Sequence, residues 1–261
     1  VLSAVVIESP KTVNIFILTK AMSLYVVSVP IGNPDDITLR AIETFKKVDF
    51  LICEEFKVAR KLLKRLDIDK DLYNINEHNE PNEADELMQL LYTDKSAALF
   101  SDCGTPLFAD PGTLLVNRCH EAGIQVIPVP GASSLLAALA VAGVNIKQFY
   151  YAGFLARQSD ERRKQIAWLK RLSCPAVIYD TPYRLIPLLE DLKKEVSDDR
   201  RVSVMVSLTQ PDERILQGTL SEVLKDVIAR PFKKEFVVIL EPIPGTERKS
   251  KKHVKTRKRR H

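Results

Sequence analysis

The fold is decided by the stretch Ser101-Asp-Cys-Gly-Thr-Pro-Leu-Phe-Ala-Asp-Pro-Gly112, together with Val129-Pro-Gly-Ala-Ser-Ser134 further along the chain. Each loop follows an apolar run typical of a buried strand, residues 97–100 and 124–129. Glycines let a ligand approach the main chain, and prolines reduce the ordering entropy that binding costs. Because the loops lie about one strand–helix unit apart, we expect them to meet at the carboxyl edge of a parallel sheet, where open α/β folds bind ligands.

Strands and helices alternate outward from these loops. Apolar runs predict strands over residues 24–29, 50–53, 97–100 and 124–129. Amphipathic spacing predicts helices over residues 37–47, 56–66, 83–92, 113–122 and 134–142, with Asp36 capping the first. Such alternation favours a parallel sheet covered by helices on both faces.

The pattern changes after Gly143. Strands are predicted over residues 149–155, 176–179, 201–208, 213–219 and 235–241, and helices over 159–172 and 185–194. The last three strands follow one another without a helix between them, which indicates a mixed or antiparallel sheet. Trp168, near Ile166 and Leu172 on one helix, is expected in the core. The predicted architecture is α/β, with two α/β domains, a cleft between them, an N-terminal parallel sheet and a C-terminal mixed sheet.

The chain of 261 residues suits two domains of this size. We expect an N-terminal extension without reliable elements at 1–21, an N-terminal domain at 22–143, a C-terminal domain at 147–244 and a disordered basic tail at 246–261. No run reaches the ~18 apolar residues of a membrane span. Residues 1–20 lack the basic start and the cleavage site of a signal peptide, so a cytoplasmic protein without membrane partners is expected.

Positive charge is concentrated at the C-terminus. Nine of the 39 Lys and Arg residues stand between Arg248 and Arg260, which leaves 30 of them against 34 Asp and Glu in residues 1–247. A run of this kind attracts a polyanion, most simply RNA, although a merely solubilising tail is the alternative.

The four cysteines, Cys53, Cys103, Cys119 and Cys174, lie far apart without metal-ligand spacing. We therefore expect no disulfide framework and no metal site, which fits a reducing cytoplasm.

Six motifs stand in an order that is familiar. They are Val27-Ser-Val-Pro-Ile-Gly-Asn-Pro-Asp-Asp-Ile-Thr-Leu-Arg-Ala41, Glu77-His-Asn-Glu80, Ser101-Asp-Cys-Gly-Thr-Pro106 with Ala109-Asp-Pro-Gly112, Val129-Pro-Gly-Ala-Ser133, Gly153-Phe-Leu155 and Thr181-Pro-Tyr-Arg184. Together they resemble the bacterial small-subunit ribosomal RNA ribose-2′-O-methyltransferase I family of the tetrapyrrole-methylase superfamily. The resemblance runs from about Leu24 to Pro242.

The chain departs from the family pattern mainly on the substrate side, at Cys53-Glu-Glu-Phe-Lys57, Tyr179-Asp-Thr-Pro-Tyr-Arg184 and Val206-Ser-Leu-Thr-Gln210. These departures suggest a diverged paralogue.

The resemblance implies S-adenosylmethionine as cofactor, bound in the cleft, and usually a homodimer. By resemblance, the cofactor would be held by Pro30, Asp102, Cys103, Gly104, Thr105, Pro106, Pro130, Gly131 and Ser133. A ribose hydroxyl must lose its proton during attack, so a general base is needed. Glu54, which aligns with an acid of the family, is the first candidate among Glu54, Glu55, Glu77, His78 and Asp180. The residues expected to contact RNA are Arg40, Lys61, His78, Arg157, Arg162, Arg163 and Arg184.

The leading hypothesis is methylation of a ribose 2′-hydroxyl in 16S ribosomal RNA, with ribosomal RNA or the 30S subunit as partner. Two alternatives stay open: methylation of a tetrapyrrole or another small molecule, and a ribosome-associated paralogue that binds S-adenosylmethionine and RNA without turnover. The basic tail argues against the tetrapyrrole.

Overall fold

The computed structural model describes residues 4–7, 14–17 and 22–242, so the basic tail expected at 246–261 lies outside the described residues. The chain divides into two compact units. Unit 1 comprises residues 1–137 together with the loop Leu208–Pro211, and unit 2 comprises the remainder. The division falls after Ala137, a few residues before the expected boundary at Gly143.

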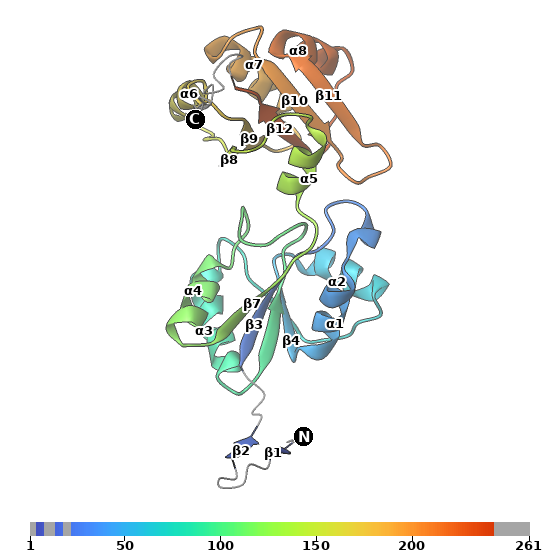
Figure 1. Ribbon diagram of the computed structural model, residues 1–261, viewed down its shortest axis with the longest axis vertical. Helices are drawn as coiled ribbons and strands as arrows, with labels where there is room; N and C mark the ends of the chain where they lie inside the picture. The colour runs from blue at the N-terminus through green and yellow to red at the C-terminus, as the bar shows by residue number, and fades with distance from the viewer. Residues whose placement is uncertain (1–3, 8–13, 18–21, 243–261) are drawn as a thin grey trace, which may run out of the picture. The chain divides into compact units, whose positions relative to one another are not determined.

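Unit 1 is built on a five-stranded sheet in which every pair of neighbours is parallel, as the alternating pattern predicted (Figure 1). The strand order is β5-β4-β6-β3-β7. Its strands are β3 (Ser23–Val27), β4 (Phe50–Cys53), β5 (Leu72–Asn74), β6 (Ser96–Leu99) and β7 (Gln125–Val129). Three adjacent strands, β6, β3 and β7, therefore deliver the loops that follow them to one edge.

Helices cover both faces of this sheet (Figure 1). One face packs against α1 (Leu39–Lys47) and α2 (Phe56–Arg65), and the other against α3 (Glu80–Leu91) and α4 (Thr113–Glu121). The first core contains Phe45 and Phe100, whose ring centroids lie 5.0 Å apart. Burial of both strand faces explains why these strands read as continuous apolar runs.

The start of the first helix differs from the prediction. Pro34–Asp36 form a short 3₁₀ helix (η1), and α1 begins only at Leu39. Thr38, rather than Asp36, caps α1, since its hydroxyl accepts a hydrogen bond from the Ala41 backbone N–H at 3.1 Å. Asp36 and Thr38 are two residues apart, and the side chain of either can accept a hydrogen bond from a helix N-terminus, so the local sequence is compatible with both caps.

Unit 2 contains the predicted mixed sheet, of order β11-β10-β12-β9-β8. The strands are β8 (Tyr150–Phe154), β9 (Ala176–Tyr179), β10 (Arg201–Val206), β11 (Arg214–Thr219) and β12 (Phe236–Leu240). Only β8 and β9 pair in parallel. Its helices are α6 (Ser159–Leu169), α7 (Leu185–Glu195) and α8 (Leu220–Ala229), whose apolar side chains share one core with the sheet.

Several further elements were not predicted from the sequence. Helix α8 separates β11 from β12, where an unbroken run of strands was expected. Residues 1–21, for which no element was expected, contain β1 (Ala4–Ile7) and β2 (Asn14–Ile17), which pair antiparallel.

Helix α5 (Ser134–Val141) contains the division between the units. No helix among the described residues is long and apolar enough to cross a membrane.

The expectation that Trp168 is a core residue is wrong. Ile166 and Leu169 are 0% and 2% exposed, but Trp168 is 45% exposed. At 100° per residue, Trp168 cannot share the helix face that Ile166 and Leu169 turn toward the core. The ring is left on the surface of unit 2.

Candidate functional site

Three loops are joined at the carboxyl edge of the unit 1 sheet. Val29, beyond β3, and Gly104, beyond β6, exchange two backbone hydrogen bonds of 2.9 and 3.1 Å. The Thr105 hydroxyl donates to the Ala132 carbonyl at 3.1 Å, and it lies 2.9 Å from the Ser28 hydroxyl. Because a hydroxyl has one proton, Ser28 is then the donor to Thr105. These bonds fix the loops after β3, β6 and β7 against one another.

Two glycines make this junction possible. Gly104 has φ +75°, a left-handed conformation that favours glycine. At Gly131, a Cβ atom would lie 3.0 Å from the Ser28 Cβ and 3.2 Å from the Ser28 carbonyl oxygen. A side chain there would push the loop after β7 away from the loop after β3.

The long loop after β6 is held at its far end by Glu80. One oxygen of its carboxylate accepts from the backbone N–H groups of Gly112 and Leu114, at 3.0 and 2.8 Å. It thereby satisfies free donors at the N-terminus of α4. Gly112 has φ +117°, and a Cβ there would lie 2.8 Å from a Leu99 methyl group. The Glu77–Glu80 motif and the Ala109–Gly112 motif thus form one structural element.

Glu54, directly after β4, lies among other carboxylates. Burial raises its pKa from the ordinary 4.5 to about 7, with further increases from the negative charges of Asp110, Asp102 and Glu77. Burial likewise raises the pKa values of Asp102 and Asp110. The Glu55 backbone N–H donates to the Asp102 carboxylate at 3.2 Å, which ties the loop after β4 to the loop after β6. A carboxyl group with a pKa near neutrality can exchange protons at physiological pH.

The loop Leu208–Pro211 completes unit 1 beside the loop after β3. The Asn33 backbone N–H donates to the Thr209 hydroxyl at 2.8 Å. A Cβ at Gly32 would lie 2.6 Å from the Leu208 carbonyl oxygen. Thr209 itself has φ +63°, an unusual conformation for a β-branched residue. Sequence reasoning assigned no role to this contact, because the two segments are 176 residues apart.

The residues expected to hold a cofactor all lie in the three joined loops. They are Pro30, Asp102, Cys103, Gly104, Thr105, Pro106, Pro130, Gly131 and Ser133. Sequence reasoning missed the part of Ser28, although a hydroxyl directly after a strand at the ligand edge was a usable signal. It also missed Glu80, whose place before an apolar helical run marks it as a residue of a helix N-terminus.

The residues expected to contact RNA fall into two groups. Lys61, His78 and Arg157 are exposed, and the His78 ring lies 3.4 Å from the Glu77 carboxylate. Arg162 is only 7% exposed and lies 2.9 Å from Asp191 and 3.5 Å from the buried Asp180. Arg184 is also paired with Asp180, and Arg163 with Glu195. The Arg162 guanidinium is therefore committed to carboxylates inside unit 2.

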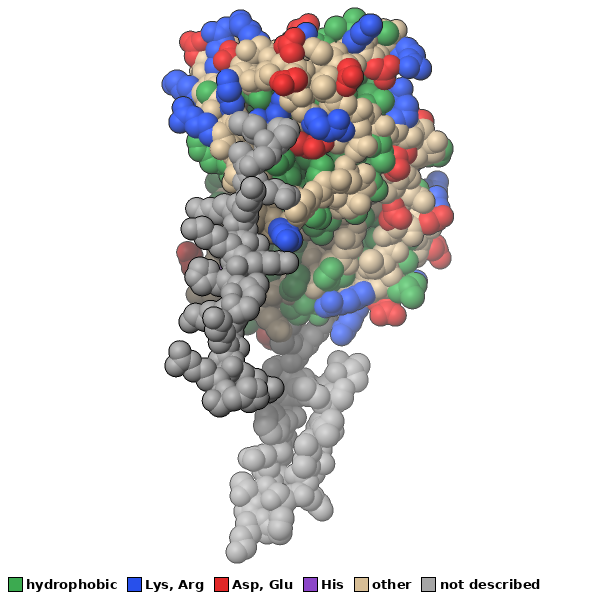
Figure 2. Space-filling model, turned by 45° about the horizontal axis from the view of Figure 1, so that its top comes forward, with side chains coloured by type: hydrophobic (Ala, Val, Ile, Leu, Met, Phe, Trp, Pro, Cys, Tyr) green, Lys and Arg blue, Asp and Glu red, His purple; other side chains and the backbone are tan. Residues whose placement is uncertain are grey.

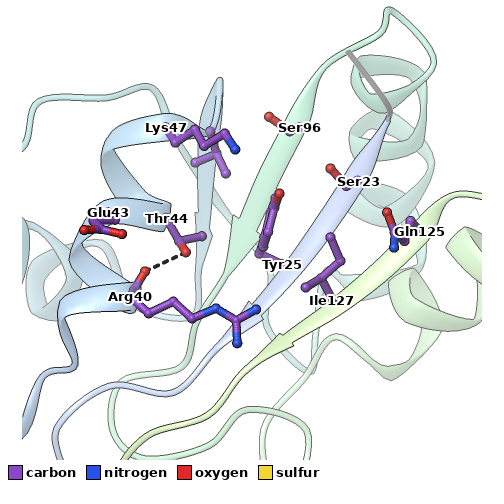
Figure 3. A pocket seen from close by; sticks show the side chains of 10 residues that line it. Ser23, Tyr25, Arg40, Glu43, Thr44, Lys47, Ser96, Gln125 and Ile127 are labelled. Atoms are coloured by element: carbon purple, nitrogen blue, oxygen red, sulfur yellow. Dashed lines mark hydrogen bonds between the residues drawn. The ribbon is translucent and has the colours of Figure 1, made fainter. Parts of the chain in front are cut away.

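Arg40 lies in a separate hollow of unit 1, with a volume of about 490 Å³. Its walls include Lys47 and Glu43 of α1, and its floor includes Tyr25 and Ile127 (Figure 3). Ser23, Ser96 and Gln125, which also line it, are the first residues of β3, β6 and β7. The joined loops follow the last residues of the same strands, so the hollow and the loops are different places on the sheet.

Comparison with solved structures identifies the fold. A crystal structure of diphthine synthase matches with a TM-score of 0.68 and 14% identity, covering 84% of this chain and 90% of that one. Cobalt precorrin-4 methyltransferase, a cobalamin biosynthetic enzyme, matches with a TM-score of 0.64 and 17% identity, covering 84% and 95%. At these identities the likeness concerns the fold, which is the tetrapyrrole methylase fold.

Sequence comparison gives the family. The family model for Tetrapyrrole (Corrin/Porphyrin) Methylases matches residues 23–224. Ribosomal RNA small subunit methyltransferase I of Neisseria meningitidis serogroup B is 40% identical over 222 residues, which are 84% of this chain and 76% of that protein. The protein of the same name from Bacillus subtilis is 35% identical over 218 residues, 84% and 74% of the two chains. The chain belongs to the tetrapyrrole methylase family, and within it to the group of ribosomal RNA small subunit methyltransferase I proteins.

Proposed function

We propose that the protein transfers a methyl group from S-adenosylmethionine to a ribose 2′-hydroxyl of 16S ribosomal RNA. The observation that carries the proposal is the position of Glu54, with a pKa of about 7, beside the joined loops of unit 1. The names of the relatives support ribosomal RNA as the substrate. The expected form is a homodimer, as the resemblance implies, and the expected location is the cytoplasm.

The residues of the joined loops fit the cofactor by their chemistry. S-adenosylmethionine carries a sulfonium and an ammonium group against one carboxylate, so it has a net positive charge. The negative charges of Asp110, Asp102 and Glu77 add to the effect of burial in raising the pKa of Glu54, so these carboxylates repel Glu54 when it is ionised. A cationic ligand would relieve this repulsion. The backbone at Gly104 and Gly131, with the hydroxyl of Ser133, would hold the remainder of the cofactor. When bound, the cofactor supplies a methyl carbon activated by the sulfonium sulfur.

The task left to the protein is alignment and proton removal. Fixed loops align donor and acceptor, and such positioning contributes much of the rate of a displacement. Glu54 would accept the proton that the ribose 2′-hydroxyl loses. Its pKa places it near the optimum for a general base at neutral pH, a contribution of roughly 10²–10⁴ in rate.

The test is methyl transfer from labelled S-adenosylmethionine to naked 16S ribosomal RNA, 30S subunits and a tetrapyrrole precursor, side by side. Label that lies next to an alkali-resistant linkage in the RNA is expected, since a 2′-O-methyl group blocks cleavage there. Label in the tetrapyrrole alone would overturn the substrate. Binding of S-adenosylmethionine without transfer to any acceptor would overturn the enzymatic role.

A further inference from the structure

Unit 2 carries an aromatic hollow that the proposed methyl-transfer chemistry does not use. It has a volume of about 280 Å³ and is lined by Tyr150 and Ala152 of β8, Leu155, and Glu161, Lys164, Gln165, Trp168 and Leu169 of α6. Tyr150 and Trp168 are 40% and 45% exposed. Large aromatic side chains that stay exposed around a hollow mark a site where a ligand can stack on them and cover their apolar faces.

The two aromatic rings contact each other, and the backbone that carries each ring is held in place. The Tyr150 and Trp168 ring centroids lie 4.4 Å apart at an interplanar angle of 63°, an edge-to-face contact. Tyr150 is anchored by its backbone N–H, which donates to the Pro175 carbonyl at 2.8 Å. Trp168 is anchored because its neighbours Ile166 and Leu169 are buried. A preorganised ring loses little entropy when a flat ligand stacks on it.

Polar groups surround the rings. The Gln165 side-chain oxygen accepts from the Ala156 backbone N–H at 2.8 Å, so its amide NH₂ faces elsewhere and has no partner among residues 22–242. Glu161 and Lys164, 3.3 Å apart, add an acceptor and a donor. This combination of π-faces with donors and acceptors suits the face and edge of a nucleobase.

The charge beside the hollow favours the same ligand. Lys170 and Arg171, which follow α6, are exposed and form no ion pair with any residue from 22 to 242. Figure 2 shows Lys and Arg side chains interspersed with Asp and Glu over the face it presents. Aromatic stacking beside cations that can follow a phosphate backbone is how proteins bind single-stranded nucleic acid. We propose that this hollow, the Tyr150–Trp168 pocket, stacks one unpaired base of the RNA substrate, an inference that rests on the proposed function.

The test uses the fluorescence of Trp168, the one tryptophan of the chain. Titration of the full-length protein with a short single-stranded oligoribonucleotide is expected to quench this emission. The same strand annealed to its complement should not, because its bases are already paired. Trp168→Ala should weaken binding of the single strand about tenfold, as loss of one stacked base does, with the affinity for S-adenosylmethionine unchanged. Trp168→Phe should retain most of the affinity.

Tyr92→Ala is the matched control, since Tyr92 is 52% exposed but lies in unit 1, at the end of α3. Full RNA affinity of Trp168→Ala, with no quenching in the parent protein, would overturn the pocket and leave the proposed function standing. Emission that changes with protein concentration, together with dissociation of Trp168→Ala into monomers, would show that a second copy covers the rings. Absence of both RNA binding and methyl transfer in the parent protein would overturn the proposed function as well.

Discussion

The hydroxyl oxygens of Ser28 and Thr105 lie 2.9 Å apart and join two loops, although the two residues are 77 positions apart in sequence. The Thr105 hydroxyl also donates to the Ala132 carbonyl, so this one side chain connects three loops. The proposed cofactor site therefore depends on a contact that no local sequence pattern contains.

Thr105→Val should loosen this junction. The change keeps the shape of the side chain but removes both hydrogen bonds, each with a net contribution of about 0.5–1.5 kcal/mol. We expect the affinity for S-adenosylmethionine, measured by calorimetry, to fall about five- to tenfold or more. Thr93→Val is the control, because the Thr93 hydroxyl donates to the Leu90 carbonyl at the exposed end of α3, away from the joined loops. Equal affinities for the two variants would argue against a role of the junction in binding.

Gly131→Ala should push the loop after β7 away from the loop after β3. The added Cβ would lie 3.0 Å from the Ser28 Cβ, so the backbone of one of the two loops would have to shift. The expected result is loss of S-adenosylmethionine binding with modest loss of stability. Gly123→Ala provides the contrast: it has φ +70° but nothing within 4 Å of the new methyl group. That variant should lose about 1 kcal/mol of stability through backbone strain and bind the cofactor normally.

Glu54→Gln should affect activity and stability in opposite directions. The pKa of Glu54 is raised from 4.5 to about 7 in the folded protein, so ionisation opposes folding. Stability from this group is greatest below pH 4.5 and falls as the pH rises to about 7. Glutamine removes the charge, and the variant should melt at a higher temperature than the parent at pH 8 and at nearly the same temperature at pH 4.5.

Methyl transfer by the parent should rise with pH through about 7, and Glu54→Gln should lose roughly 10²–10⁴ of the rate. Glu86→Gln, at an exposed position of α3, should change neither property. A parent enzyme whose rate is independent of pH between 6 and 8 would exclude Glu54 as the base, provided that methyl transfer limits the rate.

Asp180→Asn should destabilise unit 2 rather than weaken RNA binding. Asp180 is 4% exposed and faces both Arg162 and Arg184. Removing one partner of a fully buried ion pair typically costs about 3–5 kcal/mol. Here the loss should stay below that range, because Arg162 keeps Asp191 as a partner and Arg184 is partly exposed. Chemical denaturation measures this loss. Glu195→Gln, at the more exposed and longer pair with Arg163, is the control and should cost less than about 1 kcal/mol.

Neutralising the tail should weaken RNA binding in a salt-dependent way. We expect a variant with glutamine at the nine Lys and Arg positions from 248 to 260 to bind RNA less tightly and to show a shallower dependence of log affinity on log salt. The variant keeps the length of the chain, so charge alone is tested. An unchanged salt slope would assign the tail a role other than RNA contact.

The architecture could be predicted because its signals are local. Apolar runs ending in Gly- and Pro-containing loops identified the ligand edge, and the alternation of elements identified the parallel sheet. Helix α8 was missed although its signals were present: Thr219 and Glu222 form a capping box before apolar residues spaced along one face. Strand β5 is only three residues long, too short for periodicity to register.

The candidate site was harder to predict where side chains meet across the fold. Arg162 was expected to contact RNA, and its burial was not predicted, although helix periodicity places it on the same face of α6 as Ile166 and Leu169. Its partner Asp191 comes from α7 and could not be read from α6. The pKa of Glu54 is raised by burial and then by the charges of Asp110 and Asp102, which the fold brings to it from the loop after β6.

The hydrogen bond from Asn33 to Thr209 has a consequence for biosynthesis. Ribosomes release a chain from its N-terminus, and domains that are continuous in sequence can fold as they emerge. Residues 1–137 leave the ribosome before Thr209 does, so unit 1 stays incomplete beside Gly32 until residues 208–211 have emerged. A nascent or truncated chain that ends before residue 208 would lack this contact, and the loop after β3 would reach its final form only after Thr209 has been synthesised.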